Sequence, residues 1–172
     1  MKKIYRFKGN NNWGGDINDS RLSLVSNDIE FMEEMKEQIL YESRLEYPHA
    51  HVEIVPVHGA LVIMNENHSI LPEQHTILYE KYGEYSILKV PAEGWTLEEM
   101  EEIITSIRNT ASKSNVIEVI FISPVPYMIM ELARSENTGV YTRVFHNDHR
   151  EKKELPNGKI IQVVSKEGWQ LV

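Results

Sequence analysis

The stretch that decides the fold is Val116-Ile117-Glu118-Val119-Ile120-Phe121-Ile122-Ser123, which is followed at once by Pro124-Val125-Pro126. Apart from Glu118 and Ser123 its residues are apolar and mostly β-branched, which is typical of a central strand covered on both faces. Proline is favoured in the first turn of a helix, where its missing N–H leaves no hydrogen bond unmade. The stretch therefore predicts a buried strand that leads into a helix at Tyr127–Ala133.

The chain on either side of this strand repeats the order of strand and helix. Tyr85–Val90 has the composition of a strand, and Thr96-Leu97-Glu98-Glu99 is a capping box that begins a helix. An apolar stripe follows on that helix: Leu97, Met100, Ile103, Ile104 and Ile107. Tyr127–Ala133 is apolar almost all round, which predicts a largely buried helix, and Val140–Phe145 predicts a third strand. This alternation indicates an α/β, Rossmann-like fold with a mostly parallel sheet, right-handed crossovers and flanking helices.

A smaller α/β part is expected in residues 1–74, before the Rossmann-like part in residues 75–172. Its first elements are a strand at Ile4–Phe7 and a helix that begins at Asn27 or Asp28, because either side chain can accept hydrogen bonds from the first-turn amides. The apolar face of this helix is expected to carry Phe31, Met35 and Ile39.

Two further strands are expected in this part, at His51–Val57 and Ala60–Met64. Both are apolar and β-branched, and His58-Gly59 between them suggests a hairpin. The polar stretch Asn65–Gln74 is the best candidate for the linker between the two parts.

Composition excludes several classes of protein. The 172-residue chain has a net charge of −8. Because contacts with nucleic-acid phosphates need clustered Lys and Arg, we do not expect the chain to bind long DNA or RNA. The absence of cysteine excludes a disulfide framework and a Cys-based zinc site. The N-terminus is not a signal peptide, and no run approaches the roughly 18 apolar residues of a membrane-spanning helix. We therefore expect a cytoplasmic protein with no membrane contact.

The charge is unevenly spread along the chain. Residues 140–166 hold six basic and three acidic residues, a net charge of +3 within a chain of −8. This segment suits either a small anionic ligand or simply a solvated hairpin, and the count alone favours the hairpin.

Within this basic segment, His146-Asn147-Asp148-His149-Arg150 follows the third strand. In an extended chain His146, Asp148 and Arg150 point to one side, and Asn147 and His149 to the other. The first set can serve a phosphodiester, with Arg150 neutralising the phosphate and Asp148 or His146 handling a proton. The same His146 and Asp148 can hold a divalent metal, although two ligands define no metal site. The alternative is a polar strand end with an Arg–Asp ion pair.

Ser123, Pro124 and Val125 form the second candidate segment for binding a ligand. Ligands of parallel sheets bind beyond the carboxyl ends of the strands, and helix N-termini attract phosphates. Ser123 can equally be an ordinary helix cap. The chain has neither a Gly-x-Ser-x-Gly motif nor a glycine-rich dinucleotide or phosphate loop, so a serine nucleophile, NAD binding and ATP hydrolysis are not expected.

From about Tyr85 to Val164 the chain resembles the CRISPR-associated ring nucleases with a CARF-like fold. Four features carry the resemblance: Ile87-Leu88-Lys89-Val90-Pro91 before a helix, Val119-Ile120-Phe121-Ile122-Ser123 before a proline-led helix, Val140–Phe145 leading into Asp148-His149-Arg150, and a last hairpin that ends in Ile160-Ile161-Gln162-Val163-Val164. The resemblance implies that a cyclic oligoadenylate second messenger of antiviral signalling binds here and is linearised. It makes Asp148 and Arg150 the Asp-x-Arg motif of cleavage, with Ser123, Pro124, Val125, Asn147 and His149 at the ligand.

Two departures from this family leave the activity open. Pro124 replaces the family's glycine after the strand serine, and Thr138-Gly139 stands where the family carries a histidine, for which His146 is the candidate substitute. CARF and SAVED sensor domains, which bind such ligands without necessarily cutting them, fit as well, and a protein-interaction module is a third alternative. The cofactor is left open, with Mn²⁺ as the candidate ion. A homodimer is expected because symmetric ligands are commonly met by symmetric dimers.

Overall fold

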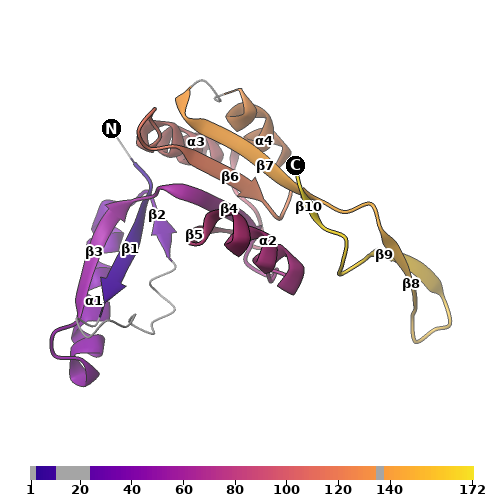
Figure 1. The fold of residues 1–172 in the computed structure, drawn as a ribbon, viewed down its shortest axis with the longest axis horizontal. Helices are drawn as coiled ribbons and strands as arrows, with labels where there is room; N and C mark the ends of the chain where they lie inside the picture. The colour runs from indigo at the N-terminus through magenta and orange to yellow at the C-terminus, as the bar shows by residue number, and fades with distance from the viewer. Residues whose placement is uncertain (1–2, 11–23, 135–137) are drawn as a thin grey trace.

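A computed structural model describes residues 3–10, 24–134 and 138–172 (Figure 1). Its helices are α1 (Ile29–Glu46), α2 (Pro72–Tyr82), α3 (Leu97–Thr110) and α4 (Pro126–Ala133). Its strands are β1 (Tyr5–Asn10), β2 (Val25–Ser26), β3 (His51–Pro56), β4 (Gly59–Asn65), β5 (Tyr85–Val90), β6 (Ile117–Phe121), β7 (Val140–His146), β8 (Arg150–Glu154), β9 (Ile160–Val164) and β10 (Gln170–Leu171).

The centre of the molecule is a five-stranded sheet with the order β10-β7-β6-β4-β5. The four strands β4 to β7 are parallel, and only the short β10 pairs antiparallel, with β7. Strands predicted at Tyr85–Val90, Val116–Ser123 and Val140–Phe145 are β5, β6 and β7, so the prediction of a mostly parallel α/β sheet is confirmed.

Helices cover both faces of this sheet, which explains the nearly continuous apolar sequence of β6. Val119 and Phe121 face the core beneath α3 and α4, whereas Ile120 faces the opposite core, where Leu78 of α2 packs. In Figure 1, α3 and α4 accordingly lie on one side of the sheet and α2 on the other. The capping box at Thr96 and Glu99 is present as predicted.

Two predictions for the first half of the chain are wrong. The strands around His58-Gly59 do not form a hairpin: β3 pairs antiparallel with β1 in a separate sheet of order β2-β1-β3, while β4 pairs with β5 and β6. The supposed linker Asn65–Gln74 contains the end of β4 and the start of α2. The five-stranded sheet thus begins at Gly59, because β4 is buried on both faces and needs neighbours on both sides.

The buried faces of two helices also differ from expectation. Asp28 caps α1 as predicted, accepting from the backbone amide of Phe31, but the buried residues are Met32, Ile39 and Leu40. Ile39 is thus buried as predicted and Met35 packs against the same core, whereas Phe31 is 40% exposed. The buried face is rotated toward Met32 and Leu40, which with Ile39 have the i, i+7 and i+8 spacing of one helix face. Met130 of α4 is 46% exposed, so that helix is buried on one side rather than all round.

Glu118, the single charged residue of β6, connects β6 to α2 and β7 through its carboxylate. Its Oε2 accepts a hydrogen bond of 2.7 Å from the Tyr82 hydroxyl and lies 3.4 Å from Nε of Arg143 and 3.6 Å from Nζ of Lys81. Burial by itself would raise the pKa of this carboxyl, but the Tyr82 hydrogen bond and the two cations together hold it below its usual value. The charge is therefore retained and joins α2 to β6 and β7.

None of the helices in the described part of the chain combines the length and the apolar character that a membrane crossing requires.

The three-stranded sheet is attached to the five-stranded one through a buried hydrogen bond. The backbone N–H of Ile4 donates to the Thr110 hydroxyl at 2.8 Å, and that hydroxyl donates to the Ser106 carbonyl oxygen at 2.7 Å. Ile4 and Val57 belong to the same apolar core as α3, so the two sheets share part of one core.

Replacing the Thr110 hydroxyl with a methyl group tests this attachment. We expect Thr110→Val to lower the free energy of unfolding by about 1–3 kcal/mol, because the buried Ile4 amide loses its acceptor. The exposed Thr76, whose hydroxyl donates to the Pro72 carbonyl oxygen, provides the control Thr76→Val, for which a change within about 0.5 kcal/mol is expected. Urea denaturation measures both, and equal effects would contradict the role assigned to Thr110.

Candidate functional site

The order of the strands places the topological switch point between β4 and β6. From β4 the chain crosses to β5 on one side, and then returns past β4 to β6 and β7 on the other. The loops that leave the carboxyl ends of β4 and β6 therefore run to opposite faces of the sheet, to α2 and α4. In open α/β sheets such a divergence makes the crevice in which ligands bind.

Ser123 lies just after β6 at this switch point and bridges the two strands. Its hydroxyl oxygen accepts from the backbone N–H of Asn65 at 2.9 Å and lies 2.7 Å from Nδ1 of His68. Ser123 is buried and does not cap α4, whose N-cap is Val125 without a side-chain hydrogen bond. The alternative of an ordinary helix cap is therefore wrong for Ser123.

His68 is a candidate residue that the sequence analysis missed. It is exposed, it follows β4 in the polar run Asn65-Glu66-Asn67-His68, and its imidazole contacts the hydroxyl of Ser123. A polar run directly after an apolar strand was the same signal that drew attention to residues 146–150. It was overlooked because residues 65–74 had been assigned to a linker.

The Ser123–His68 pair has the separation of a nucleophile and its general base, but it lacks a third member. Within the described part of the chain no carboxylate contacts His68, and the Ser123 oxygen already accepts the Asn65 amide. The pair consequently joins the ends of β4 and β6 and leaves the imidazole edge open to the crevice.

Hydrogen bonds also fix the neighbouring end of β5. The Asn65 side chain donates to the Pro91 carbonyl oxygen at 3.3 Å, and the Glu66 carboxylate accepts from the backbone N–H of Ala92 at 2.9 Å. Hydrogen bonds thus link the carboxyl ends of β4, β5 and β6 into one edge. The exposed Pro124 and the N-terminus of α4 follow β6 at this edge.

The second candidate segment continues from β7, the neighbour of β6. Phe121, the last residue of β6, pairs with Val144, and β7 ends two residues later at His146, whose side chain is exposed. The two strands are thus neighbours. Residues 147–149 belong to no strand, and β8 begins at Arg150, so the alternation of side chains from His146 to Arg150 stays a prediction.

The remaining residues of this segment form the base of an arm. Asn147 is buried and donates to the carbonyl oxygens of Ser165 and Glu167 at 3.1 and 2.9 Å, which ties β7 to the chain after β9. Nη1 of Arg150 donates to the carbonyl oxygens of Asn147 and His149 at 2.8 and 3.0 Å. The Asp148 carboxylate lies 3.6 Å from His149, rather than within an ion pair with Arg150, in the region that the structure describes.

These residues therefore divide into two groups. Ser123, Pro124 and Val125 lie at the switch point, and His146 ends the adjacent strand at the same edge. Asp148, His149 and Arg150 are exposed at the start of the β8–β9 hairpin, which Figure 1 shows projecting from the body of the molecule. Ser123 is brought together with His68 and Asn65, whereas in the described part of the chain Arg150 contacts the backbone of Asn147 and His149, and Asp148 lies next to His149.

Metal ligands are sparse near both segments. Among the described residues no group of three His, Asp or Glu side chains is placed to hold an ion. His146 and Asp148 remain two potential ligands for Mn²⁺, and they do not by themselves make a metal centre.

Neither a family model, nor a curated protein, nor a solved structure matches this chain.

The bridging role of Ser123 has a measurable consequence. We expect Ser123→Ala to lower the free energy of unfolding by about 1–2 kcal/mol, because the part-buried Asn65 amide loses its acceptor. Ser114→Ala is the matched control, since Ser114 is exposed and contacts only the Ser112 hydroxyl. If thermal and urea denaturation show equal effects for the two variants, Ser123 does not join β4 to β6.

Proposed function

We propose that this chain binds a cyclic oligoadenylate second messenger in the crevice between the carboxyl ends of β4 and β6, as part of prokaryotic antiviral (CRISPR-type) signalling. The observation that carries the proposal is the switch point itself, where Ser123, His68 and the uncapped N-terminus of α4 converge. The ligand's identity comes from the resemblance to CARF-like domains.

The chemistry of this edge suits a phosphodiester. The first-turn amides of α4 have no side-chain acceptor at the N-cap, and they carry the positive end of the helix dipole. His68 adds an exposed imidazole that can donate to a phosphate oxygen or to a base. Binding through helix amides and an imidazole requires few Lys or Arg side chains, which fits a small ligand on a protein of net charge −8.

Linearisation of the bound ring is the second candidate activity. The position of His146, exposed at the end of the strand next to β6, favours it. In this reaction a ribose 2′-oxygen attacks the adjacent phosphorus while its proton passes to a base such as His146. The bond from phosphorus to the 5′-oxygen breaks, and the 5′-oxygen takes up a proton. Asp148 and Arg150 would have to reach the ligand from the base of the arm.

A charge placed at Pro124 tests the binding site. We expect Pro124→Glu to abolish or weaken binding of cyclic tetra- or hexaadenylate by at least about tenfold, because the carboxylate competes for the α4 N-terminus and repels phosphate. Pro124→Gln is the matched neutral control, and Pro124 is exposed, so both variants should remain folded. Isothermal titration calorimetry measures the affinities.

Absence of binding by the unmodified chain to cyclic tri-, tetra- and hexaadenylate would overturn the proposal. The same mixtures, analysed by chromatography with and without Mn²⁺, separate the two activities: linear products that disappear in His146→Ala indicate a ring nuclease. Binding without turnover indicates a sensor.

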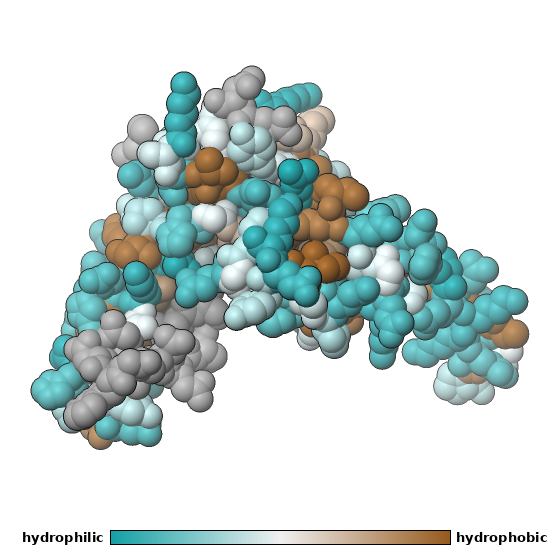
Figure 2. All heavy atoms as spheres, in the orientation of Figure 1, coloured by the Kyte–Doolittle hydropathy of each residue, from teal (hydrophilic) through white to brown (hydrophobic). Residues whose placement is uncertain are grey.

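The projecting β8–β9 hairpin supports a homodimer as the binding form. Its two strands pair only with each other, β8 is exposed throughout, and β9 exposes Ile160 by 62% and Val164 by 45%. An isolated two-stranded ribbon is at best marginally stable in water. Figure 2 shows the arm as mainly hydrophilic with hydrophobic side chains among the polar ones.

The distribution of charge supports a second copy of the chain as the partner of this arm. The segment that contains the arm has a net charge of +3, whereas the whole chain has −8, so the arm of one copy is attracted to the body of another. If the arm of each copy packs on the body of the other, the proposed sites at the carboxyl edges of the two sheets would lie around one symmetric ligand.

Substitution on the arm tests this assembly. We expect the double variant Ile160→Asp, Val164→Asp to weaken dimerisation by at least about tenfold, since it removes two apolar side chains and adds repulsion. Leu45→Asp, at a 78% exposed position of α1, is the control. Analytical ultracentrifugation measures the dissociation constants, and an unmodified chain that stays monomeric at all concentrations contradicts the assembly.

A further inference from the structure

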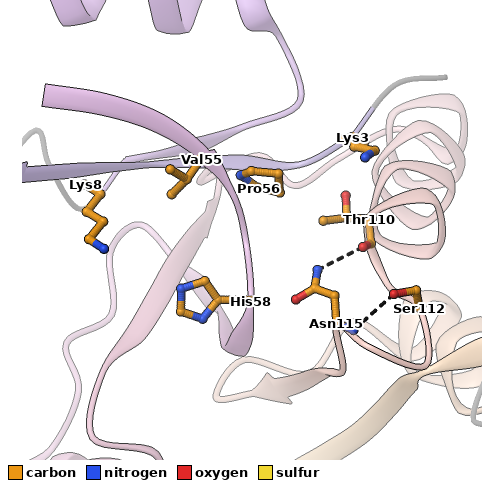
Figure 3. Close-up of a pocket in the computed structure, with 8 residues that line it drawn as sticks. All are labelled: Lys3, Lys8, Val55, Pro56, His58, Thr110, Ser112 and Asn115. Atoms are coloured by element: carbon orange, nitrogen blue, oxygen red, sulfur yellow. Dashed lines mark hydrogen bonds between the residues drawn. The ribbon is translucent and has the colours of Figure 1, made fainter.

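A cavity of about 510 Å³ lies at the amino edge of the parallel sheet, opposite the carboxyl edge considered above. It is located where the end of β3 and the start of β4 meet the chain that links α3 to β6. Figure 3 shows the residues that line it: Lys3, Lys8, Val55, Pro56, His58, Thr110, Ser112 and Asn115. Its volume is in the range of small-molecule sites.

Cations surround this cavity on an otherwise acidic protein. Lys3 and Lys8 stand at opposite ends of it (Figure 3), and neither is within 4 Å of a carboxylate in the described part of the chain. Glu53, which pairs in register with Lys8 across β1 and β3, instead bonds His51 at 2.9 Å. A ligand that satisfies both ammonium groups must therefore be elongated and anionic.

Arg6 adds a third cation, and its hydrogen bonding is incomplete. Its side chain is only 13% exposed, and Nε is buried without a hydrogen-bond partner among the described residues. Nη2 contacts Nε2 of His58 at 2.9 Å and, more weakly, the exposed Glu84 at 3.4 Å. A buried guanidinium N–H without an acceptor is uncommon, and the charge of Arg6 is compensated only by the weak contact with Glu84 among the described residues.

His58 is consequently held as a neutral imidazole beside the cavity. Burial, followed by the charges of Arg6 and Lys8, lowers the pKa of His58, and Glu84 offsets this only in part. Because Arg6 donates to Nε2, the remaining ring proton belongs on Nδ1, where it can donate to a phosphate oxygen.

An aromatic cavity of about 360 Å³ adjoins the cationic one and shares Lys8 with it. Arg6 also lines it, together with Tyr79, His75 and Tyr85. The rings of His75 and Tyr79 are stacked with an interplanar angle of 7°, and Tyr79 is 64% exposed. Such a ring is a platform on which a nucleobase can stack.

We propose that the two cavities form one binding site for a nucleoside di- or triphosphate, with the phosphates among Lys3, Lys8, Arg6 and His58 and the base on Tyr79. Lys3 and Lys8 both line the first cavity, and the shared Lys8 joins the phosphate and base regions. This site is at the opposite edge of the sheet from Ser123, and it does not depend on the function proposed for that edge.

The test compares ADP with pyrophosphate, the probes for the whole site and for its phosphate region. We expect the full-length chain to bind both, ADP the more tightly, by isothermal titration calorimetry at low salt. Lys3→Ala and Lys8→Ala should each weaken both ligands by about tenfold, since each removes a charge-assisted contact. Tyr79→Ala should weaken ADP by about tenfold and leave pyrophosphate unchanged.

Exposed residues elsewhere provide the controls. Lys113→Ala and Tyr41→Ala should leave both affinities within about twofold of the original, since Lys113 lines neither cavity and Tyr41 lies on α1, 72% exposed. Failure of the unmodified chain to bind either probe at about 1 mM overturns the site. Equal losses in Lys8→Ala and Lys113→Ala overturn it too, because they indicate general charge attraction. Pro124→Glu should not change ADP binding, which separates this test from that of the carboxyl edge.

Discussion

The parallel pairing of β4 with β6 is the constraint on which the rest of the structure depends. It places β4 at the centre of the five-stranded sheet, forces the chain to cross from β5 back over β4, and sends the following loops to opposite faces. Ser123 secures the carboxyl end of this pair by accepting the Asn65 amide. The crevice, the exposed His68 and the start of α4 all have their positions because these two strands are neighbours.

The same pairing gives the parallel sheet two edges with different chemistry. At the carboxyl edge lie the N-terminus of α4 and the imidazole of His68, which contacts Ser123. This edge has little formal charge, an arrangement suited to a phosphodiester held by dipoles. At the amino edge, the three-stranded sheet closes over the start of β4 and contributes cations to a cavity, an arrangement suited to a polyphosphate. Thr110 holds this second edge together through its bond with Ile4.

The β8–β9 arm changes the interpretation of the Asp-x-Arg segment. Arg150 is engaged with backbone carbonyl oxygens where the arm begins, and Asn147 uses its amide to anchor the arm to the returning chain. These contacts give the segment a structural role within one chain. Any contact of Asp148 and Arg150 with a ligand therefore depends on the surface against which the arm packs.

Local sequence determined most of the elements, because capping and hydrophobic periodicity are properties of neighbouring residues: Asp28 and the capping box at Thr96 both act where predicted. Local sequence could not determine strand order. His58-Gly59 has the composition of a hairpin turn, and whether β4 returns to β3 or leaves for another sheet is decided by which surfaces bury its two apolar faces. For that reason Ser123 was found from the sequence, whereas its partner His68 emerged only from the tertiary structure, which brings residues 55 positions apart into contact.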